Sequence, residues 1–336
     1  MFYGLKKIWR PWIYQGHKRR DHYFEGWYYK LVDPTGGRIL AVIPGIAKNE
    51  AARDTHAFIQ VFDGIRNTAH YHRFPSEDFQ ASRSELSLSI GSNRFHHDRI
   101  ILNIDTAEQI LTGDLQFSPP TPWPVTIFRP GYMGPYAFIP FMQCNHGVLS
   151  FDHSITGSLR HNDTTIDFTN GRGYLEKDWG TSFPGGWIWM QSNHFEEPSI
   201  SWMCSIATIP WLGSQFTGFG AGLYLKKAFY PFTTWNGSKI QNLTVTNTRT
   251  TFTILHRSYR IEVDASGQSG AKLRSPVLGK MADTVLESLQ GEISLRFFLK
   301  EKGKWVEKFE GTGRNSGLEL SLSEDGVKNF VRSLKA

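Results

Sequence analysis

Apolar and polar residues alternate along most of this sequence, and that period of two restricts the chain to strand-rich folds. The run RSELSLSIG sets Leu86, Leu88 and Ile90 against serines, and RIILNID, HRSYRIEVD, GEISLRFFLK and GLELSLS alternate in the same way. Neighbouring side chains of a strand point to opposite faces, so each run can bury one face. Turn-forming stretches such as DPTGG, RHNDT, ASGQSG and EKGK separate the runs. This spacing predicts an all-β fold of barrels or sandwiches.

Three stretches interrupt the alternation. Residues 279–290 (GKMADTVLESLQ) and 323–335 (SEDGVKNFVRSLK) predict short helices, the second capped by Ser323. Residues 117–141 contain seven prolines, which cannot continue a sheet ladder. The aromatic residues among them indicate an ordered segment that crosses between two sets of strands. Strand-rich runs occupy both halves, so we expect two antiparallel barrels, residues 1–180 and 181–336, with few short helices.

The composition narrows the class of ligand. Aromatic residues make up 14% of the chain, with 24 Phe, 12 Tyr and 11 Trp, which favours a broad apolar cavity or an aromatic core. The net charge of +6 is modest for 336 residues, and its densest basic run is Lys18-Arg19-Arg20. That balance does not predict nucleic-acid binding.

Two cysteines, Cys144 and Cys204, cannot build a disulfide framework or a Cys-x-x-Cys site. The first twenty residues lack the unbroken apolar stretch of a signal peptide, and no run of about 18 apolar residues predicts a membrane span. We therefore expect a cytosolic protein. The stretch FYGLKKIWRPWIY mixes aromatic and basic residues, which allows peripheral contact with a membrane surface. The alternative is an arm packed on the body of the protein, because Pro11 breaks any helix there.

The usual cofactor motifs are missing from the sequence. GFGAGLYL and PTGG lack the strand and helix that flank a dinucleotide turn, and there is no P-loop and no Gly-x-Ser-x-Gly elbow. His70 and His72 share a strand face, but no acidic or cysteine cluster completes a site. We expect no cofactor and no metal.

Two stretches combine acids with aromatic rings. In DHYFEGWYYKLV, a strand would place Glu25, Trp27 and Tyr29 on one face and Phe24, Tyr28 and Lys30 on the other. Such a strand either points its Glu into water or presents a carboxyl to an aromatic cavity.

The second stretch is GYLEKDWGTSFPGGWIWMQSNHF, residues 173–195. Its first part places Tyr174, Glu176 and Asp178 on one face, and Leu175, Lys177 and Trp179 on the other. Its second part lines up Trp187, Trp189, Gln191 and Asn193, an apolar wall that ends in amides and suits a ligand with a polar head and an apolar body. A carboxyl against such a wall would be desolvated and kept protonated as a general acid. The alternative is a salt bridge of Lys177 under a Trp-rich core.

At these residues the sequence resembles the tocopherol cyclase family. The shared stretches are FEGWYYKL, YLEKDWGTSFPGGWIWMQSNHF, GPYAFIPFMQCNHGVLSFDHSITGSL and the GFGAGLYL turn, in order along most of the chain. The chain departs from the family pattern at Gly185 and Gly186, where a basic residue is expected, and at Ser192, where a Cys is expected. The resemblance implies two lipocalin-like barrels, distantly similar to carotenoid hydratases of the hydroxyneurosporene synthase type.

The resemblance also implies a cofactor-independent intramolecular lyase or isomerase. An acid would protonate an alkene of a prenylated quinol, and the phenol oxygen would capture the cation to close a chromanol ring. Glu176 is the first choice of proton donor, followed by Glu25 and Asp178. The pocket would be lined by Trp27, Tyr29, Tyr174, Trp179, Trp187 and Trp189, with Gln191 and Asn193 at the polar head. Hydration or another cation reaction of an isoprenoid, and a non-catalytic carrier of apolar ligands, remain as alternatives.

Overall fold

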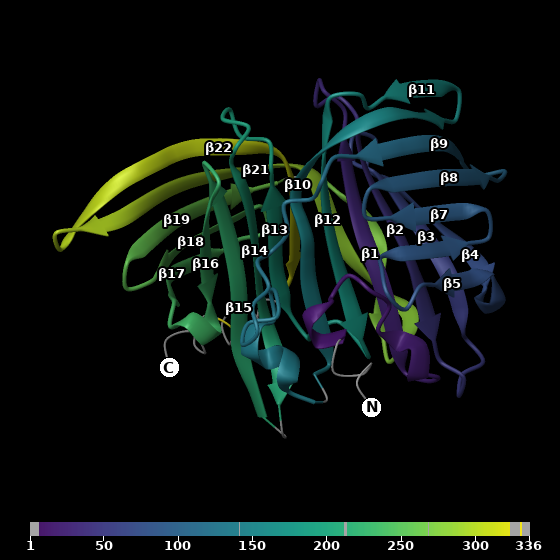
Figure 1. Cartoon of the computed structure of the whole chain (residues 1–336), viewed down its shortest axis with the longest axis horizontal. Helices are drawn as coiled ribbons and strands as arrows, with labels where there is room; N and C mark the ends of the chain where they lie inside the picture. Colours follow the sequence, from purple (N-terminus) through teal and green to yellow (C-terminus); the bar gives the residue numbers. More distant parts are fainter. Residues whose placement is uncertain (1–6, 141, 212–213, 268, 323–329, 331–336) are drawn as a thin grey trace. The chain divides into compact units, whose positions relative to one another are not determined.

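The protein is almost wholly antiparallel β-structure (Figure 1). The computed structural model describes residues 7–140, 142–211, 214–267, 269–322 and 330. The chain divides into two compact units. Unit one comprises Met1–Phe183 with Lys272–Thr284, and unit two comprises Pro184–Ala271 with Val285–Ala336. The two predicted domains, 1–180 and 181–336, stay a prediction.

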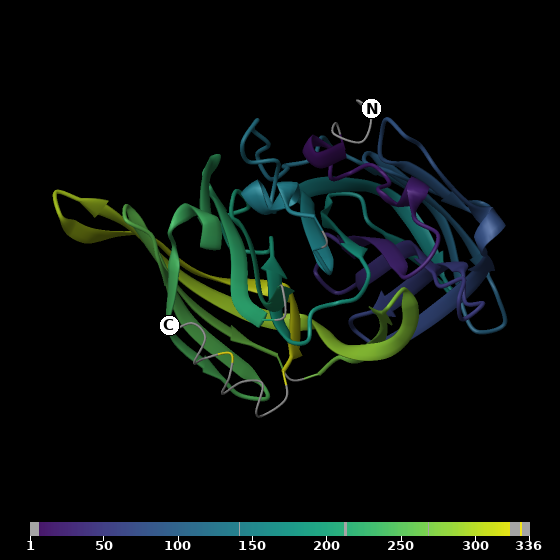
Figure 2. The ribbon, with the colours of Figure 1, turned by 90° about the horizontal axis from the view of Figure 1, so that it is seen from below.

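Unit one is built on a twelve-stranded sheet in the order β4-β3-β2-β1-β12-β10-β9-β8-β7-β6-β5, with β11 paired to β10. Its strands curve around a common interior (Figure 2). The strands of this sheet are β1 (Tyr23–Val32), β2 (Ile39–Lys48), β3 (His56–Asp63), β4 (Thr68–Pro75), β5 (Phe79–Ala81), β6 (Ser87–Ile90), β7 (Asn93–His96), β8 (Arg99–Asp105), β9 (Ile110–Phe117), β10 (Cys144–His161), β11 (Thr164–Asp167) and β12 (Gly171–Gly180).

Unit two is built on a ten-stranded sheet in the order β16-β15-β14-β13-β22-β21-β19-β18-β17, with β20 paired to β21. The strands of this sheet are β13 (Trp187–Ser192), β14 (Ser201–Trp211), β15 (Ser214–Leu225), β16 (Ala228–Thr233), β17 (Lys239–Val245), β18 (Arg249–Leu255), β19 (Tyr259–Ser266), β20 (Ala271–Val277), β21 (Lys280–Glu301) and β22 (Lys304–Ser321). Within it, residues 272–277 of β20 and 280–284 of β21 belong to unit one. The predicted all-β fold with two antiparallel, barrel-like strand sets is confirmed.

Apart from Phe330, which is helical, helical structure in the part of the chain that the structure describes is limited to short 3₁₀ turns: η1 (Lys7–Trp9), η2 (Gly16–Lys18), η3 (Ser76–Asp78), η4 (Gly134–Phe138) and η5 (Thr234–Asn236). No helix of the described residues is long and apolar enough to cross a membrane. The predicted C-terminal helix, 323–335, lies outside the described residues except for Phe330.

The predicted helix at 279–290 is wrong, because these residues belong to the turn before β21 and to β21 itself. Met281, Val285 and Leu289 are buried at intervals of four, which imitates a helical face. The neighbouring strand supplies a ladder instead, and Ser288 pairs with Leu318 of β22. Tertiary pairing therefore overrides the local helical preference.

The proline-rich segment was also misassigned. It joins β9 to β10, which are adjacent strands of the same sheet and pair from Ile155 with Phe117 to His161 with Leu111. It does not cross between two sets of strands. Its prolines keep it off the sheet edge, so it loops out and returns to the neighbouring strand. Figure 1 shows it at the same end of the strands as the N-terminal turns η1 and η2.

Unit one is completed by a segment from late in the chain, residues 272–284. Gln60 of β3 holds it by two bonds to the backbone of Arg274, at 3.0 and 2.7 Å. Asn49 donates to the Leu278 carbonyl at 2.8 Å, and the Phe183 amide donates to the Pro276 carbonyl at 3.1 Å. The sequence separation of more than two hundred residues for the Gln60 and Asn49 bonds makes this segment an integral part of unit one.

Candidate active site

The pairing of β1 with β12 distributes the candidate acids over two faces of one sheet. Glu25 lies opposite Trp179, and Trp27 lies opposite Lys177, whereas Tyr28 lies opposite Glu176. Residues that face one another across a ladder share a face, so Glu25 and Glu176 point to opposite sides. The sequence predicted the residues of each face correctly, but the three candidate acids do not gather at one point.

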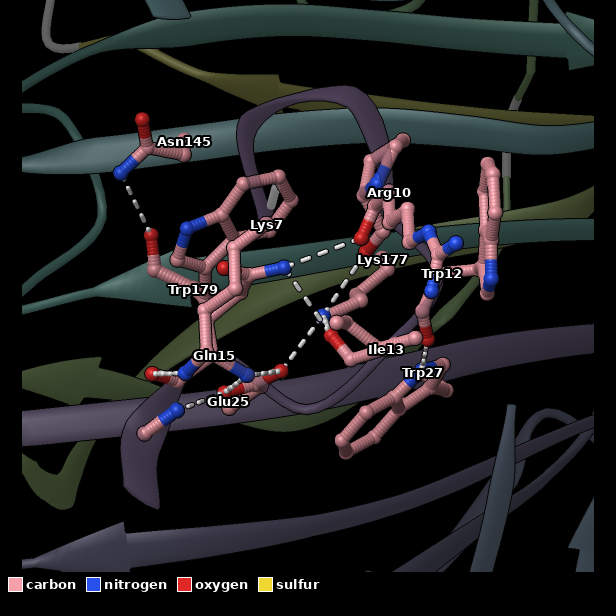
Figure 3. Close-up of polar contacts among 12 residues, drawn as sticks. Lys7, Arg10, Trp12, Ile13, Gln15, Glu25, Trp27, Asn145, Lys177 and Trp179 are labelled. Carbon is pink, nitrogen blue, oxygen red and sulfur yellow. Dashed lines mark hydrogen bonds and ion pairs between the residues drawn. The ribbon is translucent and has the colours of Figure 1, made fainter. Parts of the chain in front are cut away.

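The interior face of unit one carries a buried ion pair between Glu25 and Lys177 (Figure 3). The Lys177 Nζ lies 2.5 Å from Glu25 Oε1, and both side chains are 0% exposed. The ammonium also donates to the backbone carbonyls of Pro11, at 2.9 Å, and Ile13, at 2.6 Å. It lies 4.8 Å from the ring centre of Trp27 and 4.7 Å from that of Trp179. This pair is the salt bridge that the sequence left as the alternative interpretation.

The Glu25 carboxylate is equally well provided with donors. It accepts bonds from the Gln15 amide at 2.9 Å, the Gly16 amide at 3.0 Å and the Tyr23 hydroxyl. The backbone partners of Glu25 and Lys177 thus come from residues 11–16, which we call the strap. Burial lowers the pKa of Lys177 to about 8, against the opposing effect of Glu25. A carboxylate this fully bonded serves to fix the strap, which weakens the case for Glu25 as a proton donor.

Glu176 and Asp178 point to the other face, where they flank His146 of β10. The His146 Nδ1 lies 2.9 Å from Asp178 Oδ1, and its Nε2 lies 3.4 Å from Glu176 Oε2. The His146 and Glu176 side chains are 13% and 6% exposed, and that of Asp178 is 25% exposed. The pairing of β10 with β12 sets His146 directly opposite Asp178, which brings the imidazole between the two carboxylates.

Three groups complete the surroundings of this cluster. The Tyr174 hydroxyl donates to Glu176 Oε2, and burial together with the charge of Glu176 raises the pKa of Tyr174 well above its ordinary value. The thiol of Cys144 lies 3.9 Å from Asp178, and burial likewise raises the pKa of Cys144. The Tyr132 ring packs edge-on against the imidazole of His146, with centres 4.5 Å apart. Tyr174 and Cys144 therefore keep their protons at neutral pH.

A pocket of about 130 Å³ opens beside this cluster. The strap and η1 form one wall, the proline-rich segment forms another, and the ends of β10 and β12 form the floor. Its lining residues are Lys7, Ile8, Pro11, Gln15, Pro130, Tyr132, Met133, Ala137, Asn145, His146 and Trp179. A pocket of this size accommodates one ring or one isoprene unit of a larger ligand.

His146, Glu176 and Asp178 also offer ligand atoms within 4.8 Å of one another, a grouping that could hold a metal ion. Both ring nitrogens of His146 already face carboxylates, which suits a shared proton better than donation of a nitrogen lone pair to a metal ion. The sequence-based expectation of no metal stays a prediction.

The predicted aromatic wall belongs to unit two. Trp187, Trp189 and Gln191 alternate along β13 with Ile188 and Met190, which enter the apolar core of that unit. The wall residues occupy the opposite face, where Trp189 is 5% and Gln191 is 0% exposed. Asn193 follows directly after β13 and is also buried. Their role beside Glu176 stays a prediction.

The wall face has acids that the sequence analysis did not select. Glu319 of β22 lies opposite Trp189, and Glu287 of β21 lies opposite Glu319. The Trp187 indole donates to Glu319 at 2.6 Å, and Glu287 is 0% exposed. Glu287 and Glu319 come from β21 and β22, which lie far along the chain from β13, and no local sequence pattern links them to it.

His146 and Tyr132 are the principal residues of unit one that the sequence analysis missed. His146 shares a strand face with Cys144 and Val148, a pattern that does not single it out as a functional residue. Its proximity to Asp178 depends on the register of two strands, which the sequence does not display. Tyr132 lies in the proline-rich segment, where no periodicity predicts a direction.

The fold and this cluster define a class: a two-sheet antiparallel protein with a buried His–carboxylate cluster beside a pocket. Two solved structures share the fold. CghA, in a crystal structure with Sch210972, matches with a TM-score of 0.56 at 9% identity, covering 90% of this chain and 89% of that one. A putative AttH protein from Nitrosomonas europaea matches with a TM-score of 0.51 at 14% identity, covering 91% of this chain and 93% of that one.

The chain belongs to the tocopherol cyclase-like family, whose model matches residues 101–322. It is 23% identical over 186 residues to the chloroplastic tocopherol cyclase of Zea mays, covering 52% of this chain and 37% of that protein. It is 23% identical over 210 residues to a probable chloroplastic tocopherol cyclase of Oryza sativa subsp. japonica, covering 58% of this chain and 43% of that protein. The aligned region thus spans less than half the length of these relatives.

Proposed function

We propose that this protein is an acid-catalysing enzyme that closes a chromanol ring on a prenylated quinol, with His146, Glu176 and Asp178 as its proton-handling group. The observation that carries the proposal is the imidazole held between two largely buried carboxylates at the edge of a pocket. Membership of the tocopherol cyclase-like family supports the substrate class.

The proposed reaction conserves its proton. The cluster donates a proton to the less substituted alkene carbon of the prenyl tail, and a tertiary carbocation forms at the other carbon. The phenol oxygen attacks that carbon to make the ring C–O bond, and the phenolic proton returns to the cluster. No electrons are exchanged with a partner, so the chemistry itself calls for no redox cofactor.

Each residue has a distinct task in this scheme. Glu176 remains the first choice of donor, because Tyr174 and His146 surround it and it is nearly buried. Asp178 orients the imidazole through the 2.9 Å contact and balances its charge. Tyr132, whose ring packs against His146 and lines the pocket, would stabilise the adjacent cation by about 0.5–2 kcal/mol.

The position of Glu176 favours an enzyme over a non-catalytic carrier. A carrier of apolar ligands has no use for an acid at its pocket, and an acid turned to solvent would favour that role. Here Glu176 is 5% exposed and sits in a bonded cluster beside the pocket. Hydration differs from cyclisation in that water captures the cation, so the products separate the two reactions.

The test uses purified protein with geranylated and geranylgeranylated hydroquinones, and follows chromanol and tertiary-alcohol products by mass spectrometry. Glu176→Gln preserves shape and removes the transferable proton, so we expect at least roughly a hundredfold loss of turnover with substrate binding nearly intact. His146→Gln and Asp178→Asn should each also lower turnover.

Asp63→Asn is the matched control. Asp63 is a buried carboxylate 3.7 Å from His161, and it lies outside the pocket lining. It should keep parental turnover. If Glu176→Gln turns over at the parental rate while Glu25→Gln or Asp178→Asn is inactive, the donor role moves to that neighbour. Full activity in Glu176→Gln, His146→Gln, Asp178→Asn and Glu25→Gln alike would refute the assignment of the proton donor. A tertiary alcohol as the sole product would show that the enzyme is a hydratase and not a cyclase.

A further inference from the structure

The proline-rich segment of unit one ends in an exposed apolar tip. Val125 and Pro130 form an isolated antiparallel bridge, and Thr126 and Arg129 exchange backbone bonds at 2.9 and 3.2 Å to close a tight hairpin. Ile127 and Phe128 stand at its turn, 73% and 80% exposed. They are the two most exposed large apolar side chains among the described residues. Two such residues side by side on a rigid turn are a costly surface for a protein surrounded by water.

The N-terminal turn η1 holds this hairpin in place. The Trp9 indole donates to the Ile127 carbonyl at 2.9 Å, and its ring packs edge-on against Phe138, with centres 5.5 Å apart. Phe138 is itself 45% exposed, so the apolar surface extends from the hairpin tip over η4. Trp9 thus links the hairpin to η4.

The N-terminal segment and the proline-rich segment carry charges of one sign only. No Asp or Glu occurs in the sequence before Asp21, or between Asp114 and Asp152, so neither irregular segment contains an acid. Arg10 and Arg129 are exposed next to Trp9 and Phe128 in sequence. Apolar side chains at a turn, an indole and flanking cations are the combination that suits the boundary of an anionic lipid layer.

The tip also lies beside the pocket. Pro130 closes the hairpin, and Pro130, Tyr132, Met133 and Ala137 line the pocket together with Lys7 and Ile8 of the N-terminal segment. The pocket walls are therefore continuous with the exposed apolar surface.

We propose that the hairpin of residues 125–130 and the adjoining turn η1 dock on a lipid surface that carries anionic headgroups. Ile127 and Phe128 enter the apolar boundary, Arg10 and Arg129 contact the headgroups, and an apolar ligand dissolved in the layer reaches the pocket without crossing water. This surface binds lipid whether or not the chemistry of the proposed function is correct. It assigns to a specific hairpin the membrane contact that the sequence suggested for the N-terminal segment.

Vesicle flotation of the whole chain tests the proposal without measuring turnover. The probes are phosphatidylcholine vesicles with and without phosphatidylglycerol at about one part in three. We expect the parent to float with the anionic vesicles, and Ile127→Ser/Phe128→Ser to lower its partition coefficient by roughly tenfold or more. Arg10→Gln/Arg129→Gln should reduce binding to anionic vesicles and remove its salt dependence.

Leu278→Ser/Leu286→Ser is the matched control, because Leu278 and Leu286 are 53% and 57% exposed on other parts of the chain. It should float like the parent. Circular dichroism verifies that every variant is folded. The proposal is overturned if the parent stays in the soluble fraction with both vesicle types, or if the hairpin variant floats as well as the parent. It is also overturned if the hairpin variant abolishes self-association in light scattering while vesicle binding is absent, since the tip would then bind a second copy.

Discussion

Replacing Lys177 should release the strap. A double-mutant cycle with Glu25 measures the coupling free energy between the two side chains. Lys177→Met keeps the length of the side chain but removes its charge and its donors. The Glu25 carboxylate would remain 0% exposed and would keep the Gln15 and Gly16 amides and the Tyr23 hydroxyl as partners. The Pro11 and Ile13 carbonyls would lose the ammonium.

The expected decrease in the free energy of unfolding follows from these lost contacts. Removing one partner of a buried pair costs about 3–5 kcal/mol, and the donors that Glu25 retains place this site near the lower value. The two strap carbonyls add about 1 kcal/mol each where water cannot replace the ammonium. Glu25→Gln should lower the free energy of unfolding by a similar amount, because the NH₂ group of the new side chain would face the donors that now bind Glu25. In the double variant that NH₂ group can turn toward the space left by the ammonium, so the combined loss should fall about 2 kcal/mol short of the sum.

Urea unfolding followed by circular dichroism gives the four free energies of the cycle. Trypsin cleavage after Lys18 and Arg19, which lie just beyond the strap, reports its release, and both single variants should be cut faster than the parent. Asp63→Asn provides the comparison with another buried carboxylate. Single variants within about 1 kcal/mol of the parent would refute the reasoning, as would a coupling energy below about 0.5 kcal/mol, which is the usual error of additivity.

Two further predictions concern pH and metal ions. Burial lowers the pKa of Lys177 from 10.5 to about 8, so between these values the unfolded chain binds this proton more tightly than the folded chain. The unfolding free energy of the parent should therefore rise with pH across that window relative to Lys177→Met; parallel curves in urea titrations would contradict it. Exhaustive chelation should leave turnover unchanged, because both ring nitrogens of His146 face carboxylates; activity lost on chelation and restored by one particular metal would show that the cluster is a metal site.

The sequence predicted the faces of the strands well. Glu25, Trp27 and Tyr29 do share a face, as do Tyr174, Glu176 and Asp178, because the alternation of a strand is local and exact to one residue. The buried partner of Lys177 was also among the alternatives considered. These successes need no knowledge of which strand pairs with which.

Partners across strands could not be predicted in the same way. His146 meets Asp178 through a ladder whose register shifts between Val148 and Ser150, and such a bulge leaves no mark in the sequence. Glu25 and Glu176 proved to face opposite sides because their strands are neighbours in a register that only the fold specifies. The error at residues 279–290 has the same origin, since an interval of four between apolar residues is shared by helices and by irregularly paired strands.

The late segment of unit one has a consequence for synthesis on the ribosome. Gln60 and Asn49 emerge early, yet the backbone groups that they bind, at Arg274 and Leu278, follow more than two hundred residues later. The first sheet therefore stays incomplete, and the side-chain amides of Gln60 and Asn49 lack these partners, until most of unit two has been translated. A chain cut after Phe183 would lack residues 272–284 permanently, so unit one cannot be obtained whole by dividing the gene at one point.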